Sequence, residues 1–165
     1  MKIVFFGTPD FAARHLEALH QAGLEIVAIV TKPDKPVGRS LKIQPVPVKV
    51  MAEKLMPQVP LFQPEKCSTP EFIEILKKYP ADLFAVVAYG EIIKQAVIDL
   101  PKFGCINVHA SLLPAYRGAA PMQRCLMDGQ KETGISIIQL ILKMDAGDVL
   151  HYEKVAIAEN MTFPE

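Results

Sequence analysis

Three short stretches of nearly unbroken apolar residues most constrain how this chain can fold. They cover residues 2–6, 25–31 and 83–88, and none of them alternates between polar and apolar positions. Strands of this kind are buried on both faces, as in a parallel sheet covered by helices on both sides. Helical patterns lie between them. The sequence therefore predicts right-handed crossovers and a Rossmann-like, doubly wound α/β fold with a mostly parallel sheet.

The remaining elements continue this alternation. Four further strands are predicted over residues 59–62, 105–109, 134–140 and 149–157. Helices are predicted over residues 11–22, 48–55, 70–78, 91–98 and 119–127. For the first helix, Asp10 is the expected N-cap and Gly23 the C-terminal stop. The expected common face of that helix holds Phe11, His15, Ala18 and Leu19. Because residues 32–48 are rich in proline, we expect them to form a loop.

Length and composition indicate a single globular domain. The chain has 165 residues, half of them hydrophobic, and no stretch approaches the ~20 apolar residues of a membrane span. The short apolar N-terminus is interpreted as a strand rather than a secretory signal. Three widely spaced cysteines without a C-x-x-C pair predict reduced thiols in a cytoplasmic protein, and argue against disulfides or structural zinc. Since residues 161–165 do not resemble a domain end, we expect the domain 1–165 to be clipped before its last helix.

The run N-V-H-A-S-L-L-P over residues 107–114 carries the most chemical information. Side chains two positions apart on a strand point to the same face, so Asn107 and His109 are expected to project side by side. An amide can donate to a developing oxyanion, and an imidazole can exchange a proton near neutral pH. The pair therefore predicts chemistry at a carbonyl group.

The acidic glycine turn over residues 143–148 has two interpretations. It can be an ordinary turn between two strands. Alternatively, Asp145 faces His109 and tunes its protonation. Ligands of doubly wound sheets bind at the carboxyl ends of the strands, where Tyr89–Gly90 and residues 107–109 are also expected to lie.

The segment Gly7–Phe11 lies where a dinucleotide-binding fold has its phosphate loop. It matches neither G-x-G-x-x-G nor the G-K-[ST] ending of a Walker loop. A nucleotide cofactor is therefore poorly supported, and a tight turn from strand to helix is the simpler interpretation.

A second informative segment is strongly basic. Its basic residues are Lys32, Lys35, Arg39, Lys42 and Lys49, and its single acidic residue is Asp34. Five basic residues against one acidic residue give a local charge of +4 in a chain with no net charge. The segment is either a solvated surface loop or a contact for nucleic-acid phosphates. Loops of this length in compact domains are often functional.

Together these motifs resemble those of the folate-dependent formyltransferases. The pattern N-V-H-A-S-L-L-P-x-Y-R-G-A-A-P covers residues 107–121, and D-A-G-D follows at 145–148. The segments G-T-P-D-F-A at 7–12, P-D-K-P-V-G-R at 33–39 and V-V-A-Y-G at 86–90 narrow the likeness to members that act on tRNA. The resemblance implies formyl transfer to the α-amino group of methionine on initiator tRNA. The donor would be 10-formyltetrahydrofolate, a cosubstrate, and no metal is implied.

The resemblance also implies roles for individual residues. The catalytic trio falls on Asn107, His109 and Asp145. The expected folate contacts are Ser111, Leu112, Leu113, Pro114, Tyr89 and Ile92. The expected tRNA contacts are Arg39, Lys35 and Lys42, with Arg117 as a further contact to phosphate or substrate. The family carries a C-terminal tRNA-binding domain that these 165 residues do not include. We expect a cytoplasmic monomer that does not associate with membranes.

Two other functions stay open at this point. A sugar-nucleotide formyltransferase would share the core around residues 109–114 and the Arg-Gly turn, although the basic segment argues against it. A non-catalytic, Rossmann-like binding module would instead hold Asn107 and His109 in structural hydrogen bonds, far from Asp145.

Overall fold

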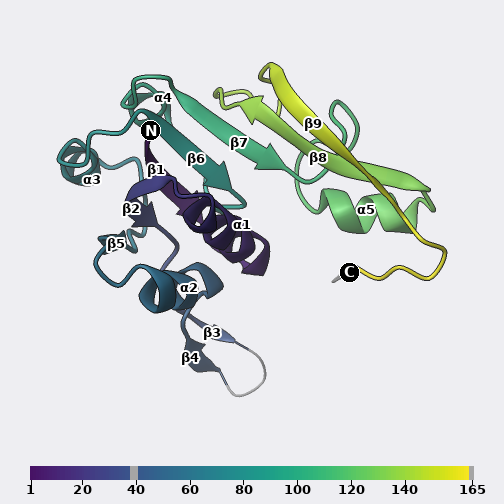
Figure 1. The fold of residues 1–165 in the computed structure, drawn as a ribbon, viewed down its shortest axis with the longest axis horizontal. Coiled ribbons are helices and arrows are strands. Elements are labelled where there is room, and N and C mark those ends of the chain that lie inside the picture. The colour runs from purple at the N-terminus through teal and green to yellow at the C-terminus, as the bar shows by residue number, and fades with distance from the viewer. Residues whose placement is uncertain (38–40, 164–165) are drawn as a thin grey trace. The chain divides into compact units, whose positions relative to one another are not determined.

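A computed structural model describes residues 1–37 and 41–163, and the chain divides into two compact units, Met1–Cys105 and Ile106–Glu165. The first unit is built on four parallel strands in the order β5-β2-β1-β6 (Figure 1). Their bounds are β1 (Lys2–Gly7), β2 (Glu25–Val30), β5 (Leu61–Phe62) and β6 (Leu83–Val87). The chain runs outward from β1 through β2 to β5, and β6 then returns to the other side of β1. Doubly wound sheets bind ligands at such a reversal of strand order.

The described part of this unit contains four helices, and its core is aromatic and aliphatic. The helices are α1 (Asp10–Gln21), α2 (Pro47–Leu55), α3 (Pro70–Leu76) and α4 (Gln95–Ile98). Phe6 is fully buried on β1, with ring centroids 5.3 Å from Phe84 and 5.5 Å from Tyr89. Because β1 is central in this group of strands, its backbone pairs with β2 on one side and with β6 on the other.

The first helix differs from its sequence prediction at its N-terminus. Pro9 is the N-cap, and Asp10 is the first helical residue, so the predicted Asp10 cap is wrong. The Asp10 carboxylate instead accepts a hydrogen bond from Arg14 at 2.8 Å on the helix surface. The C-terminal prediction is confirmed, since Gly23 follows the helix with a φ of +74°.

The buried face of α1 also differs from the prediction. Its buried residues are Ala12, Ala13 and Leu16 rather than the predicted set around Phe11. The reason is the close approach of the helix to β1. A Cβ atom on Gly7 would lie 2.7 Å from the Cβ of Ala12, so small residues are needed where these two positions meet.

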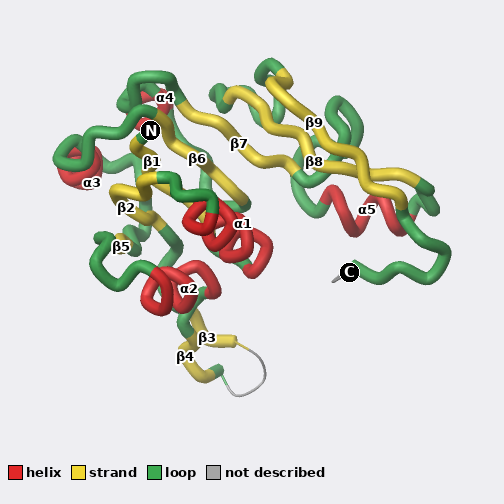
Figure 2. Tube along the Cα trace, in the orientation of Figure 1, coloured by secondary structure: helices red, strands yellow, loops and turns green. Residues whose placement is uncertain are grey.

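The proline-rich segment is predicted to be a loop, but the structure shows two short strands within it. It forms an antiparallel hairpin of β3 (Lys35–Val37) and β4 (Lys42–Gln44), which Figure 2 shows projecting beyond α2. We call these two strands the basic hairpin. Proline is depleted in strands but tolerated at sheet edges. A proline-rich sequence therefore does not by itself predict this pair of strands. Arg39 lies outside the described residues. The helix predicted over 91–98 is also shorter, because α4 begins at Gln95.

The second unit is an antiparallel arrangement in the order β7-β8-β9. Its strands are β7 (Cys105–His109), β8 (Glu132–Gln139) and β9 (Val149–Ala156), and α5 (Pro121–Met127) lies alongside β8 in Figure 1. Asn107 is paired with Ile138 and His109 with Ser136. A direct turn joins β8 to β9, because antiparallel strands need no crossover helix.

Among the described residues, no helix is both long and apolar enough to cross a bilayer. Nor is any group of three His, Cys, Asp or Glu side chains in that part of the chain placed to hold a metal ion. Cys67, Cys105 and Cys125 are free and buried. Burial raises the pKa of Cys67, and it raises the pKa of Cys105 to about 12, so both stay protonated thiols at neutral pH.

Replacing Phe6 by alanine should lower the free energy of unfolding by about 3–5 kcal/mol, because a fully buried ring leaves a cavity. Denaturant titration measures this loss. Phe103→Ala is the matched control: its side chain is 63% exposed, and the expected change is below about 1 kcal/mol. Equal losses for the two variants would contradict the assigned core.

Candidate active site

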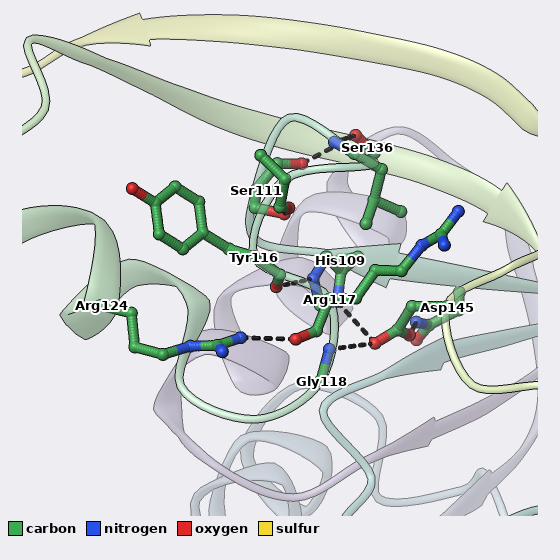
Figure 3. Close-up of polar contacts among 11 residues, drawn as sticks. His109, Ser111, Tyr116, Arg117, Gly118, Arg124, Ser136 and Asp145 are labelled. Atoms are coloured by element: carbon green, nitrogen blue, oxygen red, sulfur yellow. Dashed lines mark hydrogen bonds and ion pairs between the residues drawn. The ribbon is translucent and has the colours of Figure 1, made fainter. Parts of the chain in front are cut away.

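Asn107, His109 and Asp145 come together in the second unit. Figure 3 shows His109 and Asp145 in this site. The Asn107 amide nitrogen lies 3.5 Å from Asp145 Oδ1, at the long limit of a hydrogen bond. His109 Nδ1 lies 3.6 Å from Asp145 Oδ2. Both β7 side chains therefore approach the same carboxylate, as their spacing of two residues predicts.

Each ring nitrogen of His109 faces an acceptor. Nε2 lies 3.0 Å from the main-chain oxygen of Tyr116, and Nδ1 faces the Asp145 carboxylate. A carbonyl oxygen can only accept, so Nε2 carries a proton in this arrangement. The nitrogen whose proton can be exchanged is therefore Nδ1, in a ring that is only 6% exposed.

Asp145 is held by a close-fitting turn. Its φ of +46° is in the left-handed region, which is uncommon for a residue other than glycine. Its Oδ2 atom accepts a hydrogen bond from the Gly118 amide at 2.8 Å. A Cβ atom on Gly147 would lie 1.8 Å from the main-chain oxygen of Gln139. The turn can therefore pack this closely against β8 only if residue 147 is glycine. The turn thus serves both sequence interpretations, because it joins two strands and brings Asp145 to His109.

The loop over residues 115–120 supplies main-chain groups to the site. Tyr116, Gly118 and Ala120 have φ angles of +57°, +85° and +55°. Such strained conformations cluster at functional sites. The Tyr116 hydroxyl donates to Asp128 at 2.8 Å, and this bond raises the pKa of Tyr116. The roles of the Tyr116 carbonyl and the Gly118 amide were missed from sequence, because main-chain groups leave no residue signature.

Ser136 on β8 holds the turn of residues 111–114. Its hydroxyl donates to the Ser111 carbonyl at 2.7 Å and accepts from the Leu113 amide at 3.1 Å (Figure 3). A Cβ atom on Gly134 would lie 2.6 Å from a methyl carbon of Leu112, so Leu112 packs against the bare backbone there. Ser136 was not predicted. The sequence signal was a pair of small residues two positions apart in an otherwise bulky strand.

The expected folate contacts of the second unit have different environments. Ser111 is fully buried, and its hydroxyl donates to the Ala115 carbonyl at 2.6 Å. Leu112 and Leu113 are half-buried, Pro114 is exposed, and the Leu113-Pro114 peptide bond is cis.

In the first unit, Tyr89 is buried, and burial raises its pKa further above the usual range. Its main-chain oxygen accepts a hydrogen bond from the Thr8 hydroxyl at 2.8 Å, which joins the ends of β1 and β6. Ile92, by contrast, is 67% exposed.

A pocket of about 500 Å³ lies in the first unit at the carboxyl ends of β1, β2 and β6. It is lined by Thr8, Pro9, Lys32, Pro33, Lys35, Gln44, Pro45, Val46, Pro47, Ala88, Tyr89 and Gly90. The reversal of strand order between β1 and β6 therefore coincides with a cavity, and the basic hairpin supplies part of its wall.

Among the described basic residues of this segment, two lysines are paired with carboxylates. Lys32 pairs with Glu91 at 2.8 Å and also donates to the Glu65 carbonyl. Lys49 pairs with Asp34 at 2.6 Å. Lys35 and Lys42 are exposed on the basic hairpin.

Residues 1–165 match the family described as "Formyl transferase" along the whole chain. The chain belongs to the formyl transferase family. It is 54% identical over 165 residues to "Methionyl-tRNA formyltransferase" from Protochlamydia amoebophila. It is 50% identical over 161 residues to the protein of that name from Sulfurihydrogenibium sp.. These alignments cover 100% and 97% of this chain but 51% of each relative, so the chain spans about half the length of the curated relatives it matches.

Solved structures show the same fold. The phosphoribosylglycinamide formyltransferase from Bacillus halodurans matches with a TM-score of 0.78 at 19% identity, over 98% of this chain and 83% of that one. A formyltetrahydrofolate deformylase from Pseudomonas syringae matches with a TM-score of 0.75 at 17% identity, over 98% of this chain and 53% of that one. The fold class expected from the sequence, Rossmann-like α/β with a mostly parallel sheet, is confirmed.

Ser136→Ala should cost this formyl transferase domain about 1–3 kcal/mol in unfolding free energy, because the Leu113 amide and Ser111 carbonyl lose a buried partner. The Leu113 amide should also exchange hydrogen faster. Denaturation and hydrogen exchange measure these effects. Glu132→Gln on the same strand breaks only an exposed ion pair with Lys154, so its change should stay within about 0.5 kcal/mol. An unchanged hydrogen-exchange rate at the Leu113 amide in Ser136→Ala would show that Ser136 does not hold this turn.

Proposed function

We propose that the protein transfers a formyl group from 10-formyltetrahydrofolate to the amino group of methionine on initiator tRNA. The observation that carries the chemistry is the convergence of an amide, an imidazole and a carboxylate at the end of β7. The choice of tRNA as acceptor is supported by relatives named methionyl-tRNA formyltransferase, which are 54% and 50% identical in sequence to this chain.

The nucleophile in this proposal is the substrate's own amine. Its nitrogen attacks the formyl carbon, a new C–N bond forms, and the formyl oxygen becomes a tetrahedral oxyanion. The Asn107 side-chain N–H donates to that oxyanion, which is the charge an oxyanion hole stabilises. Collapse of the intermediate breaks the C–N bond to the folate, and a proton passes from the amine to the folate nitrogen.

His109 and Asp145 handle this proton. Nε2 of His109 is held by the Tyr116 carbonyl, so Nδ1 is the ring atom available for exchange. The Asp145 carboxylate stabilises a positive imidazolium beside it, and it is itself oriented by the Gly118 amide. Proton transfer of this kind acts directly or through one water molecule.

The folate is proposed to contact the turn of residues 111–114, together with Tyr89 and Ile92. Ser136 holds this turn, which supports a preorganised binding surface. Because the Ser111 hydroxyl is bonded to Ala115 and the Tyr89 ring is buried, their contacts would come from main-chain atoms. Ile92 would contribute an exposed apolar side chain.

The tRNA is proposed to bind the basic hairpin through Lys35, Lys42 and Arg39, with Arg117 as a further contact. Neutralisation of phosphates by such side chains releases counterions, so binding should weaken as salt rises. The decisive assay uses the complete natural protein with charged initiator tRNA in one arm and an amino-sugar nucleotide in the other. Formylation of the sugar alone would overturn the proposed substrate.

Asn107→Ala should lower kcat for tRNA formylation by about 10²–10³-fold, because one donor to the oxyanion is lost. Single-turnover kinetics of the complete protein measures the chemical step. Asn160→Ala, an exposed amide in the second unit, is the matched control and should leave kcat unchanged. Near-normal formylation by Asn107→Ala would refute the oxyanion role.

Lys42→Ala should weaken tRNA binding and reduce the slope of log K against log salt by roughly 0.7–0.9, the value for one phosphate contact. Arg39→Ala should act in the same direction. Binding titrations between low and physiological salt measure both. Lys78→Ala, an exposed lysine just after α3, is the control and should keep the wild-type slope. If Arg39→Ala impaired turnover of a sugar nucleotide but not of charged tRNA, the assigned partner would be wrong.

A further inference from the structure

The carboxylate of Asp34, the residue just before the basic hairpin, accepts hydrogen bonds from three residues. Its Oδ2 atom accepts from Lys49 Nζ at 2.6 Å. Its Oδ1 atom accepts from the Gln63 amide at 2.8 Å, and the Val46 main-chain N–H lies 3.4 Å away. The carboxylate is 22% exposed and the Lys49 side chain 24%, so the pair is largely shielded from water.

Asp34 and its three partners come from four different parts of the first unit. Asp34 itself precedes β3, Val46 follows β4, Lys49 lies on α2, and Gln63 follows β5. Gln63 also donates to the Lys32 carbonyl at 2.9 Å. One carboxylate therefore joins both ends of the basic hairpin to a helix and to a strand end. The hairpin itself extends beyond α2 (Figure 2).

The charge of Asp34 is opposite to that expected for contact with phosphate. It is the single acidic residue of a segment that also holds five basic residues. A carboxylate at this position repels an approaching polyanion, so charge alone would disfavour it. Its contacts provide a geometric reason for its presence.

We propose that Asp34 is a positioning residue, which sets the direction of the basic hairpin so that Lys35 and Lys42 meet the tRNA. This inference rests on the proposed function, because it names the substrate of the same site. Asp34 touches no reacting atom in this role. It acts by holding the base of the hairpin against Lys49 and Gln63.

The Asp34–Lys49 pair is charged throughout the ordinary assay range. The hydrogen bond to Lys49 holds the pKa of Asp34 below its usual 3.8, and the same bond raises the pKa of Lys49 above 10.5. The carboxylate's contribution is therefore present above pH 3.8 and is lost only as pH falls through the lowered value. The ammonium's contribution is present below pH 10.5 and is lost only as pH rises through the raised value.

The test is Asp34→Asn in the complete natural protein, because positioning and simple electrostatics predict opposite results. Removing a negative charge would tighten tRNA binding if the segment acted only as a charged patch. A positioning role predicts a KM for charged tRNA about tenfold higher, with kcat within about twofold, since a charge-assisted hydrogen bond is lost. Glu53→Gln, an exposed acid on α2, is the matched control and should not raise KM.

Variants of the partner lysine make the test independent of one substitution. Lys49→Met should raise KM for charged tRNA as Asp34→Asn does. Lys49→Arg should raise KM much less than Lys49→Met, because arginine keeps a hydrogen-bond donor. The double variant Asp34→Asn with Lys49→Met should be no worse than either single variant, because both remove the same contact. Additive effects of opposite sign would instead indicate a charged patch and overturn the proposal.

Hydrogen exchange separates this inference from the proposed function. Asp34→Asn should speed exchange at the amides of β3, β4 and Val46, whether or not a substrate is present. A wild-type protein that does not formylate charged tRNA refutes the proposed function and the substrate named here. A wild-type protein that does so, beside an Asp34→Asn variant with unchanged KM and unchanged hairpin exchange, refutes the positioning role alone.

Discussion

The geometry of the candidate site depends on one carboxylate, that of Asp145. It accepts a hydrogen bond from the Gly118 amide and faces both His109 and Asn107. Without it, a nearly buried imidazole would lose the carboxylate that it faces, and the loop before α5 would lose the hydrogen bond of its Gly118 amide. Its place is set in turn by a left-handed backbone and by Gly147, which leaves no room for a Cβ atom against β8. The site therefore requires a particular turn as well as particular side chains.

Strand β8 serves as the platform for this arrangement. Ser136 holds the turn of residues 111–114, Gly134 receives Leu112, and Gln139 lies against Gly147. Gly134 and Ser136 on β8 allow the turn of residues 111–114 to approach closely, and Gly147 on the other turn allows that turn to approach the β8 backbone. Preorganisation of this kind places donors before charge develops, which is the most effective form of electrostatic catalysis.

The basic segment shows how pairing redistributes charge. Lys32 and Lys49 are held by Glu91 and Asp34, and so they act inside the fold. Lys35 and Lys42 remain exposed on the hairpin. The segment thus combines a paired base with an exposed arm, and a single acidic residue connects the two.

The sequence alone predicts the order of strands and helices in the first unit apart from the basic hairpin, because apolar runs and helical periodicity are local patterns. It also determined that Asn107 and His109 share a face, which follows from the period of two in a strand. Three features follow instead from packing: the small residue of α1 that meets Gly7, the hairpin within the proline-rich segment, and the hydrogen bonds of Ser136 to the turn of residues 111–114. These features depend on backbone approach between segments far apart in the chain. Such distances arise from packing, and no local pattern of residues encodes them.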